Sequence, residues 1–300
     1  MSTPSAAHDD AGSRPDRDGD RDGDGGGGGR GGRLGRVVRA PLGWMLAGLL
    51  GVGLVSGLTA TGPGPVPVLG AVAAVAVYWV VMRRVAGRST PEIARPGAGR
   101  EALRGGAVGL GFVLVSALLI TAFGGYDFSW AGNGFFSVVW SAAMVQAGAA
   151  VTEELMFRGL ALQALEQLWG SRAAIVITGL FFGVAHLGAP GASAWSALAI
   201  ALEAGVMLGV AFLWRRSIWF VAGLHFVWNF AEQLLGIPVS GHTPQGLFTV
   251  DTHGSALLSG GTFGLEASVV PVLIGVLLIV RMVVLAGRSG GLRPRRPGRR

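Results

Sequence analysis

Two adjacent carboxylates and an arginine, at Glu153, Glu154 and Arg158, occur within a long apolar stretch of the sequence. An ionisable group at the centre of a membrane-spanning helix costs about 2.5–3.5 kcal/mol on insertion scales, so it normally has a partner and a function. Residues four apart share one face of a helix, whereas neighbouring residues point in different directions. The spacing therefore predicts that Arg158 pairs with Glu154, which makes Glu153 the freer candidate to act on a water molecule; which of the two glutamates is the base stays open.

Two further apolar stretches carry polar side chains at a spacing of four. Phe182 precedes His186 by one helical turn and can shield its imidazole, while His225 and Asn229 project from one face of another helix. A carboxylate can take a proton from water and deliver it to a leaving amine, and imidazole or carboxamide N–H groups can donate to an oxyanion. Together these groups suffice for hydrolysis of a peptide bond by an activated water.

The same side chains leave two possibilities for a cofactor, zinc or none. Two histidines with one or two glutamates match a catalytic zinc ligand set, and the candidate ligands are Glu153, His186 and His225. The helical H-E-x-x-H motif is absent, so the composition does not decide between a metal and a metal-free mechanism. The chain has no cysteine, which excludes a thiol nucleophile and a disulfide framework.

Each feature taken alone also has a structural interpretation. An intramembrane histidine or asparagine can be an interhelical hydrogen-bond partner worth about 0.6–2 kcal/mol. Glu154 and Arg158 can form a buried ion pair without a catalytic role. Five other polar residues are interpreted as structural, because they lie near span ends, lack a partner four residues on, or belong to an expected external loop: Glu166, Glu203, Glu232, His242 and His253.

The composition is that of a membrane protein, because 51% of the 300 residues are hydrophobic and only 14% are charged. The fold class predicted is an all-α, polytopic bundle with a polar catalytic cavity. Apolar windows predict eight spans, at 42–60, 66–82, 105–123, 135–155, 173–187, 195–214, 218–235 and 267–285. Segment 160–169 could continue the fourth helix or form a short amphipathic helix at the cytoplasmic interface. The second is favoured, because one helix over 135–168 would be about 50 Å long, too long for a bilayer.

Arginine accounts for all 24 basic residues, and these arginines flank the predicted spans. Arginine-rich and arginine-free connections alternate, which places both termini in the cytoplasm by the positive-inside rule. Arginines used in this way argue against a nucleic-acid partner. The abundance of Ala, Gly and Arg without Lys indicates a GC-rich bacterial genome. We therefore expect a multi-pass protein of the bacterial plasma (inner) membrane, with the paired glutamates toward its cytoplasmic half.

Three regions follow from this pattern. Residues 1–40 are rich in Arg, Asp and Gly, cannot bury enough apolar surface to fold, and are expected to form a disordered cytoplasmic tail. Residues 41–287 are predicted to form the transmembrane domain, with a catalytic core over about 135–235. Residues 288–300 are expected to form a basic cytoplasmic tail.

In order and spacing, Glu153-Glu154-x-x-x-Arg158, Phe182-x-x-x-His186 and His225-x-x-x-Asn229 resemble the three-motif signature of the CPBP family. This family, also called ABI, contains intramembrane proteases similar to CAAX prenyl protease 2. The resemblance implies an endopeptidase in which both glutamates, assisted by His186, activate a water. It also implies that His225 and Asn229 form the oxyanion site and that Arg158 orients the glutamate pair. Its partners would be the lipid bilayer and a membrane-protein or peptide substrate.

Two alternatives use the same residues. A proton-coupled transporter would also bury carboxylates and histidines, but it predicts inverted repeats, and the two halves of the sequence show no clear correspondence. A non-catalytic immunity or scaffold protein of the same family would keep the fold without needing the glutamates. Substituting Glu153 and Glu154 separates a protease from such a protein. In a bacterium, prenylated CAAX proteins are not the expected substrates.

Overall fold

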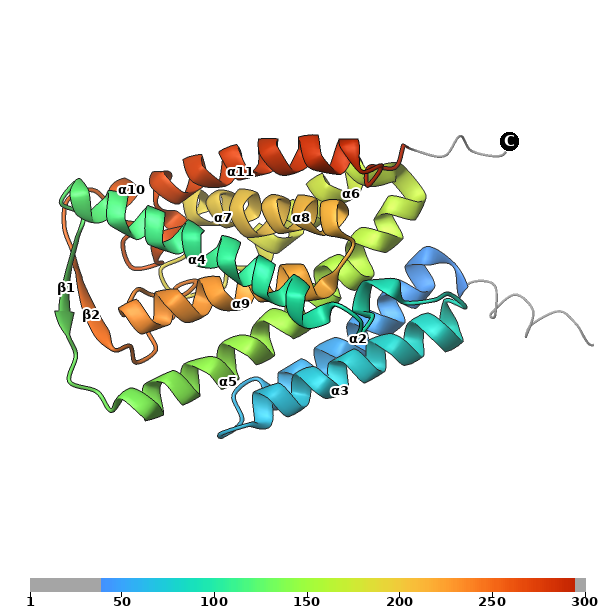
Figure 1. Ribbon diagram of the computed structural model, residues 1–300, viewed down its shortest axis with the longest axis horizontal. Helices are drawn as coiled ribbons and strands as arrows, with labels where there is room; N and C mark the ends of the chain where they lie inside the picture. Colours follow the sequence, from blue (N-terminus) through green and yellow to red (C-terminus); the bar gives the residue numbers. More distant parts are fainter. Residues whose placement is uncertain (1–38, 295–300) are drawn as a thin grey trace, which may run out of the picture.

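The computed structural model describes residues 39–294, so the predicted tail at 1–40 lies almost wholly outside the described residues, as does the end of the tail at 288–300. The helices run along one long axis, and the chain crosses from end to end (Figure 1). Six helices of the described part are long and apolar enough to span a membrane, and one of them, Phe135–Ala185, contains two crossings. The predicted all-α, polytopic membrane fold is confirmed.

Eight helical segments lie at or near the predicted spans, seven of them within those six helices and the eighth, Ile218–Leu235, outside them. The third begins at Ala98 rather than at Gly105, because the helix continues past the apolar stretch to Glu101, which pairs with Arg215 at 2.6 Å. The crossings are α2 (Pro41–Thr59), α3 with η1 (Val66–Val80, Val81–Val85), α4 (Ala98–Ala122), α5 with η3 (Phe135–Glu154, Leu155–Leu162), α6 (Gln163–Ala185), α7 with η4 and α8 (Ala194–Ile200, Ala201–Met207, Leu208–Arg215), α9 (Ile218–Leu235) and α11 (Val269–Arg288). The shorter helices are η2 (Pro91–Ile93), α10 (Ala256–Ser259) and η5 (Leu265–Ala267).

The two ends of the bundle differ in charge. At the end that we call the ribbon end, β1 (Tyr126–Trp130) and β2 (Phe248–Thr252) form an antiparallel pair (Figure 1). The connections at this end, 60–65, 123–134, 186–193 and 236–268, contain no Arg or Lys. At the opposite end, which we call the basic end, lie both ends of the described chain and the arginine-rich connections. The β ribbon was not predicted from the sequence.

Segment 160–169 is not a separate short helix, so that prediction was wrong. The helix of α5 continues through the π-helical η3 into α6 and bends at Gly170, where a φ of 82° breaks the helix. Leu160 and Leu162 are buried in the protein core instead of facing lipid. Single π-helical turns are frequent at functional sites, and η3 carries Arg158.

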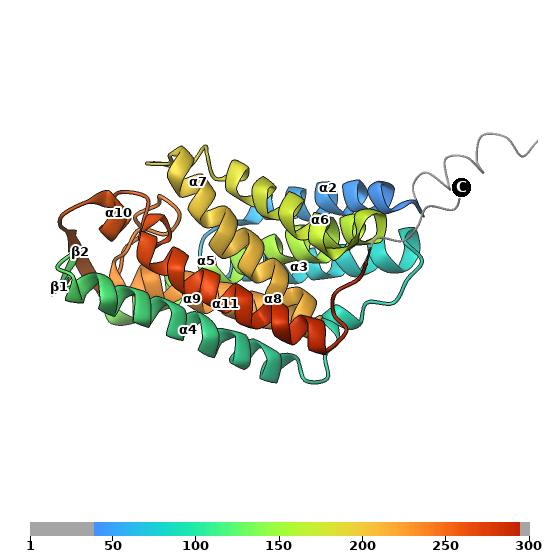
Figure 2. The same cartoon turned by 90° about the horizontal axis from the view of Figure 1, so that it is seen from above.

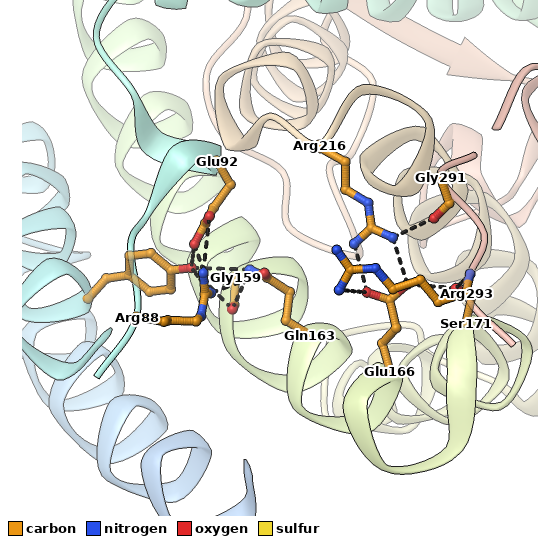
Figure 3. Close-up of polar contacts among 10 residues, drawn as sticks. Arg88, Glu92, Gly159, Gln163, Glu166, Ser171, Arg216, Gly291 and Arg293 are labelled. Carbon is orange, nitrogen blue, oxygen red and sulfur yellow. Dashed lines mark hydrogen bonds and ion pairs between the residues drawn. The ribbon is translucent and has the colours of Figure 1, made fainter. Parts of the chain in front are cut away.

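Two polar networks hold this bend at the basic end (Figure 3). In one, Arg88 donates to Glu92 at 2.8 Å and to Gln163 of α6 at 3.0 Å. In the other, Arg216 donates to both carboxylate oxygens of Glu166 at 2.7 Å. Glu166 therefore has the structural role expected of it, as the buried partner of an ion pair.

Helices α4 and α9 meet backbone to backbone. A Cβ atom on Gly109 of α4 would overlap the carbonyl oxygen of Leu224, and one on Gly223 of α9 would overlap the carbonyl oxygen of Ala102. Small residues allow this close approach of helices in membranes. The contact fixes the position of α9 in the bundle and, with it, the side chains that α9 presents to the interior.

Candidate functional site

A cavity of about 610 Å³ lies between α5, α6, α7 and α9 and extends toward the ribbon end. The structure brings four predicted catalytic residues to its wall, Glu153, His186, His225 and Asn229, together with the predicted orienting residue Phe182. They come from three different crossings, as the three motifs predict. Most of the remaining wall is apolar, with Val145, Ala149, Phe182, Ala185, Ala189, Ile200, Ala204, Trp228 and Val239 among its residues.

Glu154 and Arg158 lie behind this wall and are almost completely buried. Nη1 of Arg158 donates to Oε1 of Glu154 at 2.8 Å, which is the predicted pair. Nη2 donates to the backbone carbonyls of Ala204 and Gly205 in η4. A buried charge without partners is strongly destabilising, so these contacts satisfy the guanidinium. They also fix the Glu154 carboxylate and join η3 to η4.

His225 lies between the two carboxylates. Its Nδ1 atom is 2.9 Å from Oε1 of Glu154, and its Nε2 atom is 4.0 Å from Oε2 of Glu153. An ionised carboxylate only accepts hydrogen bonds, so Nδ1 carries a proton, and Nε2 is the ring nitrogen that faces Glu153. The Glu153 side chain is 31% exposed and that of Glu154 is fully buried, so Glu153 is the carboxylate that reaches the cavity.

His186 lies at the end of α6, on another part of the wall. Its ring stacks on Phe182 with 4.7 Å between ring centroids, in agreement with the predicted shielding. Nδ1 of His186 donates to the carbonyl oxygen of Phe182 at 2.8 Å, since a carbonyl can only accept. Nε2 is therefore the ring nitrogen that can exchange a proton with a bound molecule.

Asn229 follows His225 by one turn of α9 and lines the same cavity. Its side chain is largely buried, and none of the described residues holds its carboxamide by a hydrogen bond. An amide that is buried at a cavity wall without a protein partner can donate to whatever occupies the cavity. The geometry thus leaves the Asn229 N–H groups available to a bound carbonyl oxygen.

The candidate metal ligands Glu153, His186 and His225 line one cavity but do not form a metal site. Within residues 39–294, no three His, Cys, Asp or Glu side chains are close enough together to hold a metal ion. The facing atoms of Glu153 and His225 lie 4.0 Å apart, and His186 does not join them in a cluster of three. As arranged, these side chains do not fit the predicted zinc alternative.

Besides Gln146 of α5, three polar cavity residues were not predicted from the sequence: Ser240, His242 and Glu266. They belong to the connection between α9 and α11, which folds back over the cavity. The backbone N–H and Oγ of Ser240 donate to Oε1 of Glu266 at 3.0 and 3.1 Å. Burial raises the pKa of Glu266 to about 7. In the sequence, the only sign of a role for Glu266 is its position as a lone carboxylate directly before the last predicted span. His242 was predicted to be a residue of the external loop.

Residues 135–231 match a family model described as type II CAAX prenyl endopeptidase Rce1-like. The matched stretch contains all three motifs, so the resemblance to the CPBP and CAAX prenyl protease 2-like family is confirmed there. The match supports a membrane protease of the CAAX prenyl endopeptidase kind. No curated protein and no solved structure matched the chain.

Proposed function

We propose that the chain is an intramembrane endopeptidase in which Glu153 activates a water for hydrolysis of a peptide bond. The observation that carries this proposal is the position of Glu153. Of the two adjacent glutamates, it is the one on the cavity wall, where it faces Nε2 of His225 and shares the wall with Asn229. A free carboxylate, an oriented imidazole and an amide donor around one cavity are the groups that this hydrolysis requires.

The gap between Glu153 and His225 suits one water molecule. Their facing atoms are 4.0 Å apart, which is too long for a direct hydrogen bond, and a water can donate one O–H to each. The water oxygen then has its lone pairs free to attack a carbonyl carbon. Glu153 takes one proton from the water as the new carbon–oxygen bond forms.

Asn229 supplies donors for the second half of the reaction. The attacked carbonyl oxygen becomes an oxyanion, and the Asn229 carboxamide donates to it. Protonated Glu153 then gives its proton to the leaving nitrogen, the carbon–nitrogen bond breaks, and a carboxylic acid and an amine are released. The resemblance also assigns His225 to the oxyanion site. Because its Nδ1 is held by Glu154, His225 can donate there only through a protonated Nε2.

Two residues act on the others in this proposal. Glu154 is held by Arg158 away from the cavity, so we assign it a positioning role: it fixes the tautomer and direction of His225. His186 assists by exchanging a proton through Nε2, since its Nδ1 is held by the Phe182 carbonyl. This division of labour makes Glu153 the base, whereas the motif alone leaves the choice between the two glutamates open.

The setting proposed is the bacterial plasma membrane, with both termini in the cytoplasm. A transporter is less favoured because the buried Glu154–Arg158 pair bounds the cavity toward the basic end. A non-catalytic immunity or scaffold protein of the same family has no need of a carboxylate held free at a cavity wall. It predicts that protection survives substitution of Glu153.

The test compares the N-termini of membrane proteins in cells that produce the wild type, Glu153→Gln or Asp127→Asn. Asp127 is an exposed carboxylate of β1 and serves as the matched control. We expect new peptide ends with the wild type and the control, and none with Glu153→Gln. The same ends in all three samples, with equal amounts of inserted protein, would contradict the proposal.

A further inference from the structure

The cavity opens at the ribbon end of the bundle. Its outermost wall is formed by Gly188, which follows α6, and by His242 and Pro244, which follow α9. Gly188 and His242 are exposed. In both views the ribbon lies at one end of the molecule, and the last turns of α8 and α11 lie at the other (Figures 1 and 2). A peptide therefore reaches Glu153 from the end opposite to the arginine-rich connections.

A side opening accompanies this mouth. Helices α5 and α6 are the two arms of one bent helix, joined at the basic end. Val145 on one arm and Ala185 on the other line the cavity and are both exposed, Val145 by 38%. An extended segment can thus enter between the arms from the membrane as well as from the ribbon end.

The wall carries acidic groups and no arginine or lysine. Its carboxylates are Glu153 and Glu266, its other titratable side chains are histidines, and no Arg or Lys of the described chain lines it. The nearest guanidinium in the motifs, that of Arg158, is buried and bound to Glu154. A peptide tail that ends near the scissile bond would bring its α-carboxylate beside these glutamates without a cationic partner, and like charges in a partly desolvated site repel.

We propose that the cavity receives internal peptide segments on the non-cytoplasmic side of the membrane, and not carboxylate-ended tails such as a C-terminal CAAX box. The positive-inside rule assigns the basic end to the cytoplasm, so the arginine-free ribbon end faces outward. The substrate class is a membrane-anchored polypeptide whose chain continues past the cleaved bond on that side. That such a polypeptide is cleaved rests on the proposed function. The side on which the cavity opens, and the preference of the cavity for cationic over anionic molecules, do not.

The test uses the absence of cysteine from the chain, which makes single-cysteine variants unambiguous. Ala149→Cys places a thiol in the cavity, His242→Cys places one at its mouth, and Ser89→Cys places one on the exposed basic-end connection. The full-length variants are produced in cells, from which spheroplasts and inverted membrane vesicles are prepared. Each preparation is treated with membrane-impermeant methanethiosulfonate reagents of similar size, one cationic and one anionic.

We expect the reagents to modify Ala149→Cys and His242→Cys in spheroplasts, and Ser89→Cys in inverted vesicles. Relative to its rate with a free thiol in solution, the cationic reagent should react severalfold faster than the anionic one at Ala149→Cys, while at Ser89→Cys the two relative rates should be similar. Modification of Ala149→Cys only in inverted vesicles, or in neither preparation, would overturn the assigned opening. Equal relative rates for both reagents would overturn the exclusion of carboxylate-ended tails.

These outcomes are separate from those of the proposed function, because labelling needs no catalysis. If the cysteines are modified as expected but no Glu153-dependent peptide ends are found, the cavity opens as inferred and the proposed peptidase activity is absent. Where such ends are found, the inference adds a further expectation: the cleaved bonds lie within outward-facing segments and away from the substrates' C-termini. Cleavage confined to cytoplasmic C-terminal tails would contradict it even if the enzyme is active.

Discussion

The Nδ1 atom of His225 lies 2.9 Å from Oε1 of Glu154, and both side chains are buried. This contact joins the first motif, on α5, to the third, on α9, and turns Nε2 of the imidazole toward Glu153. Neighbouring residues on a helix point in different directions. Two adjacent glutamates can therefore serve one histidine in different ways, one by orienting the ring and the other by sharing a water with it.

Arg158→Lys should destabilise the protein. The guanidinium donates at once to Glu154 and to two carbonyls of η4, and a lysine ammonium lacks the fork that spans them. Leaving buried acceptors unsatisfied costs about 1–3 kcal/mol each, so thermal unfolding in detergent should begin at a clearly lower temperature. Arg84→Lys, at an exposed basic-end position, should unfold like the wild type. Equal stability of the two variants would show that the fork is not needed.

Asn229→Ala should lower kcat by about 10²–10³, the range for removal of one oxyanion donor. The KM should change little, because the proposed bond strengthens only in the transition state. Asn133→Ala is the matched control, since that asparagine donates to the carbonyl of Gly246 at the ribbon end. Steady-state kinetics on a cleaved substrate measure both constants. A change in KM alone would assign Asn229 to substrate binding.

Gly109→Ala should disrupt the contact between α4 and α9, whereas Gly111→Ala should be tolerated. A Cβ at Gly109 meets the backbone carbonyl of Leu224, and one at Gly111 meets nothing within 4 Å. Overpacking typically costs about 1–3 kcal/mol, and a displaced α9 also moves His225, so both stability and activity should fall. Thermal unfolding and cleavage rates are measured for Gly109→Ala and Gly111→Ala. Similar behaviour of the two variants would contradict the backbone contact.

Helical spacing was sufficient to predict the contacts that form within a single helix of the site. The pair of Glu154 with Arg158 and the stack of Phe182 on His186 each follow from residues four apart on one helix. Spacing could not show that His225 would turn one nitrogen to each glutamate. That depends on how α9 packs against α4 and α5.

Other features depend on contacts between distant parts of the chain. The β ribbon joins two five-residue strands that are far apart in the sequence, and neither has enough alternation to be seen alone. Glu266 reaches the cavity because a long connection folds back over it. In segment 160–169, the apolar pattern fits a membrane interface and a protein core equally well, and pairing of Glu166 with Arg216 selects the core.

The stability of the ribbon end should fall as pH rises. Burial raises the pKa of Glu266 to about 7, above the value of about 4.3 expected in the unfolded chain. Between these values the folded state binds more protons than the unfolded state, so the free energy of unfolding decreases with increasing pH across that window.

Thermal unfolding between about pH 4.5 and pH 8 measures this dependence. The wild type should unfold at progressively lower temperature over the window, and Glu266→Gln, which stays neutral, should show a smaller slope. Asp127→Asn should keep the slope of the wild type, because Asp127 is 79% exposed. An unchanged slope in Glu266→Gln would place the titrating group elsewhere.

The most direct test of the central claim is the cleavage rate of Glu153→Gln beside that of the wild type, on a substrate identified from the new peptide ends. Both proteins are purified, reconstituted in lipid and shown to unfold at the same temperature. Loss of a general base should lower kcat by about 10²–10⁴. A Glu153→Gln variant that is folded and cleaves at the wild-type rate would contradict the assignment of Glu153 as the residue that activates the water.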